Sequence, residues 1–152
     1  MPARQTPATR AATAAGIGFA LHEYTHAPGA PSFALEAAQA LSLDPARVFK
    51  TLVVMRDERM IVCLVPSDAT LDLRGLGKHA TLAPPERAQA ATGYVVGGIS
   101  PLGQRRRLAT LIDASARSHA TIFVSAGRRG LEMELAPDDL IAFTDAEVRP
   151  LT

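Results

Sequence analysis

The stretch that decides the fold runs from Val48 to Val65 and reads VFKTLVVMRDERMIVCLV. Two apolar segments rich in β-branched residues, 48–55 and 60–65, flank a charged turn at 56–59. This pattern is typical of two buried strands that are joined by a tight turn. The sequence therefore predicts a β-hairpin over these residues.

Upstream of the hairpin, capping and turn residues divide the chain into short elements. Thr6 is a good helix cap, and Pro7 suits the first helical position because its missing N–H would be unpaired there in any case. Glycines at positions 16 and 18 end this helix. The predicted elements are a helix over 8–15, a strand over 19–24, a loop over 27–31, a helix over 33–41 capped by Ser32, and a short helical turn at 44–45.

Downstream of the hairpin, strands and helices follow one another without a strict alternation. The predicted elements are a short helix over 71–79, a helix from 84 to the stop at Gly93, a short strand and structured loop over 94–103, strands over 108–112 and 121–125, a turn over 127–130, a strand over 131–135, a last helix from Pro137 and a short terminal strand. Two hairpins without a regular βα repeat predict the α/β class, with a mixed β-sheet wrapped by helices. We expect one domain over 1–152.

Composition excludes several classes of protein. Hydrophobic residues make up 47% of the chain and charged residues 20%, which is ordinary for a folded domain and not for a disordered tail. No apolar run reaches the roughly 18 residues of a membrane span, and the first residues lack the apolar stretch of a signal peptide. Cys63 has no second cysteine to pair with. We therefore expect a cytoplasmic protein without a membrane partner.

The charge is small overall but unevenly distributed. The formal net charge is +1, which argues against a protein that binds DNA through bulk positive charge. Residues 94–130 nevertheless carry six arginines and one aspartate, and 131–152 carry six acidic residues and one arginine. The arginines at 105–107, 128 and 129 are either phosphate contacts or a solvated surface. The candidate phosphate contacts are Arg105, Arg106, Arg107, Arg128 and Arg129.

Lys50 is the first candidate for chemistry. The chain has two lysines, Lys50 and Lys78, among its 16 basic residues, so a lysine is the less expected basic residue at its position. A lysine near the start of a buried strand is costly unless its ammonium group reaches solvent or an anion. Its side chain either extends to solvent from the strand end, or stands at the mouth of a cleft to meet a carbonyl oxygen, a ribose or a phosphate.

The second candidate is the glycine-rich loop GGISPLG at 97–103. Glycine permits unusual backbone dihedrals and close approach, so the loop could present N–H and C=O groups to a ligand. It matches neither the Walker A loop nor the GxGxxG fingerprint. A tight structural turn is the alternative interpretation.

Histidine and serine lack the spacing that catalysis needs. The four histidines show no metal-ligand spacing, and no GxSxG surrounds Ser100 or Ser125. We therefore expect neither a metal nor a serine-hydrolase triad.

Four further side chains have either an unreactive or a functional interpretation. Cys63 lies within an apolar strand and is expected to be a buried, inert thiol. Tyr24 fits either the wall of a cleft or a half-buried strand position. Glu132 and Glu134 share one strand face, which is typical of a solvated edge and less so of an acid/base pair.

Four segments together resemble a known family. They are HEYTH at 22–26, VFKTL at 48–52, TGYVVGGISPLGQ at 92–104 and IFVSAGRRGL at 122–131. The chain resembles the YbaK-type aminoacyl-tRNA deacylases, relatives of the editing domain of bacterial prolyl-tRNA synthetases, over nearly its whole length. It is most similar to the Cys-tRNA(Pro) deacylase branch. The resemblance implies a mixed, strongly curved β-sheet wrapped by helices.

The resemblance also implies roles for individual residues. Lys50 stands at the position of the family's essential lysine, and Gly97 begins the GxxxP loop that Pro101 closes. The backbone of this loop, including Gly98, Ile99 and Ser100, would line the aminoacyl pocket. Tyr24 and Ser125 fall on pocket positions, and Glu132 stands where the Cys-specific branch usually has aspartate. We expect Lys50 and the loop to face one cavity.

The implied activity is the deacylation of a mischarged tRNA, most specifically Cys-tRNA(Pro), with the substrate's own thiol attacking its ester. The implied partners are the tRNA acceptor end and prolyl-tRNA synthetase, with no cofactor and no metal. Two alternatives stay open. One is editing of Ala-tRNA(Pro) with an attacking water, and the other is a non-catalytic module that binds tRNA or a synthetase.

Overall fold

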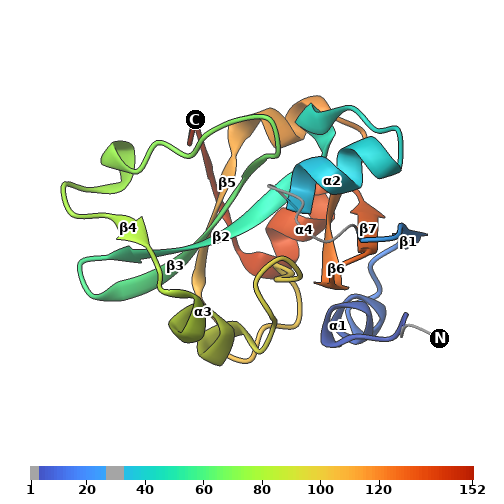
Figure 1. Ribbon diagram of the computed structural model, residues 1–152, viewed down its shortest axis with the longest axis horizontal. Helices are drawn as coiled ribbons and strands as arrows, with labels where there is room; N and C mark the ends of the chain where they lie inside the picture. Colours follow the sequence, from blue (N-terminus) through green and yellow to red (C-terminus); the bar gives the residue numbers. More distant parts are fainter. Residues whose placement is uncertain (1–3, 27–32) are drawn as a thin grey trace.

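The computed structural model describes residues 4–26 and 33–152 and has a mixed α/β architecture (Figure 1). The helices are α1 (Pro7–Ala14), α2 (Phe33–Ala40), α3 (Pro85–Thr92) and α4 (Pro137–Thr144), with short 3₁₀ turns at η1 (Pro45–Arg47), η2 (Arg74–Leu76) and η3 (Ala114–Ser118). The strands are β1 (Phe19–Glu23), β2 (Phe49–Arg56), β3 (Arg59–Pro66), β4 (Thr81–Leu82), β5 (Ala109–Asp113), β6 (Ile122–Arg128), β7 (Leu131–Leu135) and β8 (Glu147–Arg149). The predicted fold class is confirmed.

The strands form two sheets. The larger one has the order β4-β2-β3-β5-β8 and is mixed, because β2 and β3 are antiparallel while β3, β5 and β8 are parallel neighbours. The smaller one is antiparallel, with the order β1-β7-β6. The predicted hairpin over 48–65 is the β2–β3 pair, and Asp57 and Glu58 form its turn with positive φ angles of 51° and 66°.

The predicted helices agree closely with the structure. Thr6 caps α1 and accepts a hydrogen bond from the Thr9 N–H, and Asp44 caps the short turn η1. Gly93 ends α3 in the left-handed conformation, as its position after the helix predicts. The predicted loop over 27–31 and the Ser32 cap lie outside the described residues.

Two local predictions were wrong, and one short strand was missed. Residues 71–79 form only the three-residue turn η2, because Gly75 and Gly77 interrupt the segment and Gly77 has a φ of 149°. No strand forms at 94–96, since this segment bends directly out of α3 into the glycine loop. The two-residue strand β4 was missed because so short an edge strand leaves no periodic pattern.

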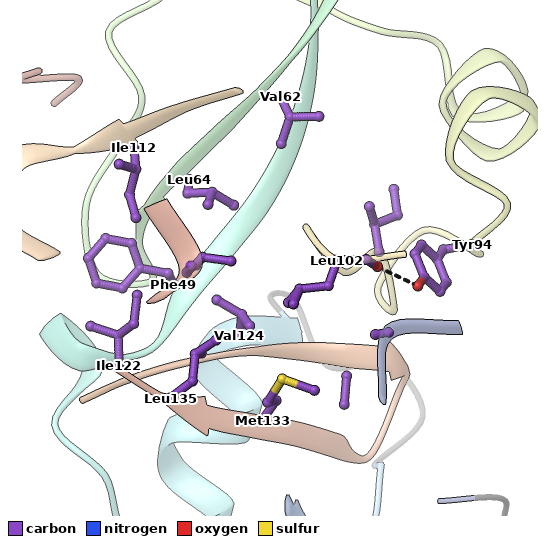
Figure 2. Packing of buried hydrophobic residues seen from close by; sticks show 14 of the residues in the cluster. Phe49, Val62, Leu64, Tyr94, Leu102, Ile112, Ile122, Val124, Met133 and Leu135 are labelled. Atoms are coloured by element: carbon purple, nitrogen blue, oxygen red, sulfur yellow. Dashed lines mark hydrogen bonds between the residues drawn. The ribbon is translucent and has the colours of Figure 1, made fainter. Parts of the chain in front are cut away.

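The main hydrophobic core lies between the two sheets. Val62 and Leu64 of β3 face it, together with Ile122, Val124, Met133 and Leu135 of the small sheet (Figure 2). Helices α1, α3 and α4 contribute apolar residues to the same core. The alternate residues of β3, Ile61, Cys63 and Val65, pack into a second cluster with Leu71 and Leu151. Because β3 is covered on both faces, its sequence is continuously apolar.

Cys63 is fully buried in the second cluster, as predicted. Burial raises the pKa of its thiol to about 11, so the unreactive thiol form prevails at neutral pH. Within the described residues, no helix combines the length and the hydrophobicity that crossing a bilayer requires.

The segment after α3 is braced from within. The Tyr94 hydroxyl donates a 2.6 Å hydrogen bond to the Leu102 carbonyl, which spans the base of the glycine loop (Figure 2). Tyr94 and Leu102 are both buried in the main core. The loop ends are therefore fixed by packing and by a hydrogen bond within the core.

We expect the Tyr94→Phe substitution to destabilise the protein by about 1–3 kcal/mol, because it removes the donor to a buried carbonyl while keeping the ring. Urea unfolding monitored by circular dichroism would measure the change. An unchanged unfolding midpoint would show that the brace contributes nothing to stability.

Candidate functional site

A cavity opens where the two sheets separate. Val48 and Phe123 form an isolated parallel bridge that joins the sheets. Two residues further along the two strands lie Lys50 on β2 and Ser125 on β6, and both line a cavity of about 380 Å³. On its outer edge β2 pairs with β4 at Val54 and Met55, so no described strand covers that edge at 49–52. The cavity occupies this open edge.

Four parts of the chain supply the cavity wall. Residues 49–52 of β2, the start of α2, the loop at 96–99 and the β6–β7 hairpin all reach it. Lys50, Gly97, Ile99, Ser125 and Glu132 are therefore brought together, as the sequence predicts for Lys50 and the glycine loop. Pockets that bind small molecules are mostly apolar with a few polar groups, and this wall has that composition.

Ser125 and Glu132 reach the cavity through strand register. They are directly paired across β6 and β7, so their side chains share one face of the small sheet. A bulge between Ser125 and Arg128 then interrupts the pairing, and Gly127 in it has a φ of 108°. The opposite face carries Val124 and Met133 into the main core. The solvated-edge interpretation of Glu132 is thus wrong.

Glu132 is a buried carboxyl group, and one of its two oxygens is unpaired within the described residues. Its exposed fraction is 5%, and its Oε2 has no hydrogen bond from any residue that the structure describes. Burial raises the pKa of Glu132 from 4.5 to about 8, because desolvation penalises the carboxylate. Glu132 is therefore mainly protonated at neutral pH, and it can both donate and accept hydrogen bonds.

Lys50 is half-buried at the opposite strand, β2. Its ammonium group donates a 2.7 Å hydrogen bond to the Ala69 carbonyl, and its other two N–H groups have no partner among the described residues. Burial lowers the pKa of Lys50, and Asp68 opposes this shift. Burial is the largest cause of the pKa shift at both Lys50 and Glu132.

The loop at 96–98 fits tightly against its neighbours. Gly97 has a φ of 94°, and a Cβ there would lie 2.6 Å from Arg129 Nε and 2.9 Å from Phe33 Cδ2. A Cβ on Gly98 would lie 2.8 Å from the Arg128 Cα. Any larger residue at either position would push the loop away from the β6–β7 hairpin. The two glycines therefore allow the loop to pack closely against that hairpin.

Three predicted pocket residues of the glycine loop do not line this cavity. Ser100 is fully buried, and its hydroxyl accepts a hydrogen bond from the Leu102 N–H. Pro101 lines a separate depression of about 210 Å³. Gly98 packs on the hairpin backbone. The loop bends inward after Ile99 because Leu102 is drawn into the core, which turns Ser100 and Pro101 away.

Tyr24 stands beside the cavity and is absent from its wall. It packs on Val48 and Phe123, which fits the half-buried strand-end alternative. Burial and the nearby Glu132 raise the pKa of Tyr24 to about 12, so the phenol is neutral.

The candidate arginines are divided between two places. Arg105, Arg106 and Arg107 are exposed, and Arg106 and Arg107 border the separate depression near Pro101. Arg128 approaches Glu23 at 3.8 Å, and Arg129 binds the Val96 carbonyl. A role in phosphate contact stays a prediction for all five.

Sequence reasoning missed several wall residues. Phe33, Ala34 and Val96 line the cavity only because α2 and the loop fold over it. Thr51 also lines it, and its Oγ1 is buried without a partner among the described residues. The Thr51 hydroxyl, next to Lys50 in an otherwise apolar strand, was the feature of the sequence that could have indicated a wall residue. No group of three or more His, Cys, Asp and Glu side chains suited to a metal occurs in 4–26 and 33–152.

We expect the stability of the protein to fall as the pH rises from about 4.5 to 8, because the raised pKa makes the folded state hold its proton more tightly than the unfolded state. The Glu132→Gln variant should lack this part of the pH dependence. Its free energy of unfolding should therefore increase relative to that of the wild type as the pH rises. Urea unfolding at several pH values would measure it. Parallel profiles for the two proteins would contradict a buried, protonated Glu132.

The family model of the aminoacyl-tRNA editing domain matches residues 28–143. A proposed Cys-tRNA(Pro)/Cys-tRNA(Cys) deacylase of Enterococcus faecalis, EbsC, is 33% identical over 121 residues, which cover 76% of this chain and 74% of that protein. A proline–tRNA ligase of Moorella thermoacetica is 38% identical over 81 residues, which are 50% of this chain and 14% of the ligase.

A solved structure of a similar protein has the same fold. The crystal structure of a proposed trans-editing enzyme for prolyl tRNA synthetase superimposes with a TM-score of 0.83 and 26% identity, and it covers 99% of both chains. The family model and the solved structure both span the residues that build the cavity. The chain therefore belongs to the family of aminoacyl-tRNA editing domains.

Proposed function

We propose that this protein is a deacylase that removes a mischarged amino acid from tRNA in trans, and that its substrate is Cys-tRNA(Pro). The observation that carries the proposal is the meeting of Lys50, Gly97, Ser125 and Glu132 around one cavity of about 380 Å³. This volume lies within the roughly 300–1,000 Å³ of small-molecule sites, so it suits an aminoacyl group with its ribose. Relatives named as deacylase and trans-editing enzyme support the same reaction.

Two buried polar groups supply the recognition. Thr51 Oγ1 and Glu132 Oε2 lack partners in the described part of the chain, and an unpaired buried polar group costs about 1–3 kcal/mol. A bound aminoacyl ester would provide the missing hydrogen bonds. The Glu132 carboxyl would bind the α-amino group of the substrate, and an ammonium group beside it would favour the carboxylate form.

Lys50 supplies the electrostatic stabilisation. Ester cleavage places negative charge on the carbonyl oxygen in the transition state, and an ammonium group in a partly desolvated cavity stabilises that charge more than water does. The hydrogen bond to Ala69 holds the Lys50 Nζ in place and leaves two N–H groups for the substrate. The pKa of Lys50 is lowered by burial, so its proton is also more readily shared.

Among the described residues, no side chain is placed as a nucleophile. The Ser125 hydroxyl accepts a 3.2 Å hydrogen bond from the Gly127 N–H, and no described histidine contacts it. Cys63 lies in the second hydrophobic cluster, away from the cavity wall. The cavity therefore acts by positioning the ester and stabilising charge, and the nucleophile comes from the substrate or from water.

For a cysteinyl ester the substrate thiol is the nucleophile. Its sulfur forms a bond to the ester carbonyl carbon, the bond from that carbon to the 3′ oxygen breaks, and the thiol proton ends on the ribose hydroxyl. The products are a cyclic thiolactone and free tRNA, and water then opens the thiolactone to cysteine. This step needs orientation and charge stabilisation, which the cavity offers.

The proposed partners follow from the substrate. The acceptor end of the tRNA would enter the cavity, and the small net charge of +1 predicts weak contact with the rest of the tRNA. Prolyl-tRNA synthetase would then supply the missing tRNA recognition. The cytoplasm, where aminoacyl-tRNA is made, is the proposed location.

We expect the Lys50→Ala variant to lose deacylation of Cys-tRNA(Pro) by about 100-fold or more in kcat, which is the size of effect seen when an oxyanion-stabilising donor is removed. Lys78→Ala is the matched control, because Lys78 is exposed and is the chain's other lysine. Release of labelled cysteine in single-turnover assays would measure both. Near-normal turnover by Lys50→Ala would refute the role of Lys50.

We expect Cys-tRNA(Pro) to be deacylated at least about tenfold faster than the 2-aminobutyryl ester, in which a methyl group replaces the thiol. A panel with Cys-, aminobutyryl-, Ala- and Ser-tRNA(Pro) would test this. Equal rates for the first two would mean that water attacks. Cleavage of Ala-tRNA(Pro) alone would make the protein an alanine editor, and binding without any cleavage would make it a non-catalytic module.

A further inference from the structure

Three parts of the chain converge on one arginine at the rim of the cavity. Arg129 lies in the turn between β6 and β7, and its Nε and terminal NH2 donate to the Val96 carbonyl at 3.3 and 2.9 Å. Its guanidinium carbon lies 4.2 Å from the centroid of the Phe33 ring. Phe33 begins α2, and Phe33 and Val96 both line the cavity. Arg129 thus connects the β6–β7 turn, the loop at 96–99 and helix α2.

The contact determines where the loop lies. The Val96 carbonyl is held by Arg129, and the Val96 N–H donates to Gln89 Oε1 at 3.1 Å, so the residue is held from both sides. Gly97 follows directly, and a Cβ on it would lie 2.6 Å from Arg129 Nε. Because the loop, the guanidinium group and Phe33 touch one another, a shift of Arg129 would move both walls of the cavity.

We propose that Arg129 is a positioning residue that clamps the Val96–Gly97 loop against Phe33 and so sets the shape of the cavity for the aminoacyl ester. This inference rests on the proposed function. Arginine suits the role because its planar group can donate two hydrogen bonds to one oxygen and stack on an aromatic ring at the same time. Lysine has neither the planar group nor the fixed fork of donors.

The competing interpretation is contact with a tRNA phosphate. Arg129 is exposed, and the remaining donors of its guanidinium group can face solvent. The two roles differ in the substrate on which they depend. A clamp acts on any ester that enters the cavity, whereas a phosphate contact acts only on a substrate that carries phosphates.

The kinetic experiment compares two substrates, Cys-tRNA(Pro) and 3′-O-cysteinyl adenosine, which has no phosphate. We expect Arg129→Ala to lower kcat by about 10- to 100-fold on both, since small displacements in a positioned site have effects of this size. Arg129→Lys should not restore the rate, and Arg59→Ala, an exposed arginine on the β2–β3 hairpin, should match the wild type. A loss confined to the tRNA substrate, seen in KM and abolished by added salt, would overturn the clamp.

Hydrogen exchange gives a measurement that does not depend on catalysis. We expect the amides of residues 95–99 to exchange at least about tenfold faster in Arg129→Ala than in the wild type and in Arg59→Ala. Unchanged exchange would overturn the clamp even in an active enzyme. If the wild type cleaves neither substrate, the proposed function is refuted. Faster exchange in Arg129→Ala would even then support Arg129 as a structural clamp of the loop.

Discussion

The site depends on the parallel bridge between Val48 and Phe123, where the two sheets touch before they separate. Strand β2 continues into the larger sheet and β6 into the smaller one, so the residues that follow the bridge face each other across a gap. Lys50 and Ser125 are those residues. The packing of Phe123 against Val48 and of Phe49 in the main core holds the bridge in place, so the same interactions stabilise the fold and open the cavity.

Around this gap the protein keeps polar groups that its own chain does not satisfy. Thr51, Glu132 and two N–H groups of Lys50 all lack partners in the described residues, and burial shifts the pKa of both ionisable groups toward the neutral form. A core built for stability alone would not retain such groups, because each raises the free energy of the folded state. Their grouping in one cavity is the physical sign of a binding site.

Local patterns predicted most elements and part of the site. The capped helices, the central hairpin and the pairing of Lys50 with the glycine loop came from residue types and the family resemblance, and the structure confirms that Lys50 and Gly97 share a cavity. The error at Pro101 and Ser100 arose because a loop's direction depends on what its later residues contact. Phe33 and Val96 could not be found from local patterns, since each becomes a wall residue only when α2 and the loop at 96–99 fold over the cavity.

The sequence by itself determined most of the helices and strands, because caps, glycines and β-branched runs act over a few residues. It also determined which residue types are available for chemistry, including one lysine in a buried strand and one cysteine kept inert. Only the tertiary structure decided that Glu132 is a buried acid and not a solvated edge, because that depends on which sheet face is covered. It likewise decided which loop residues face the cavity, since burial and unpaired groups arise from contacts between distant segments.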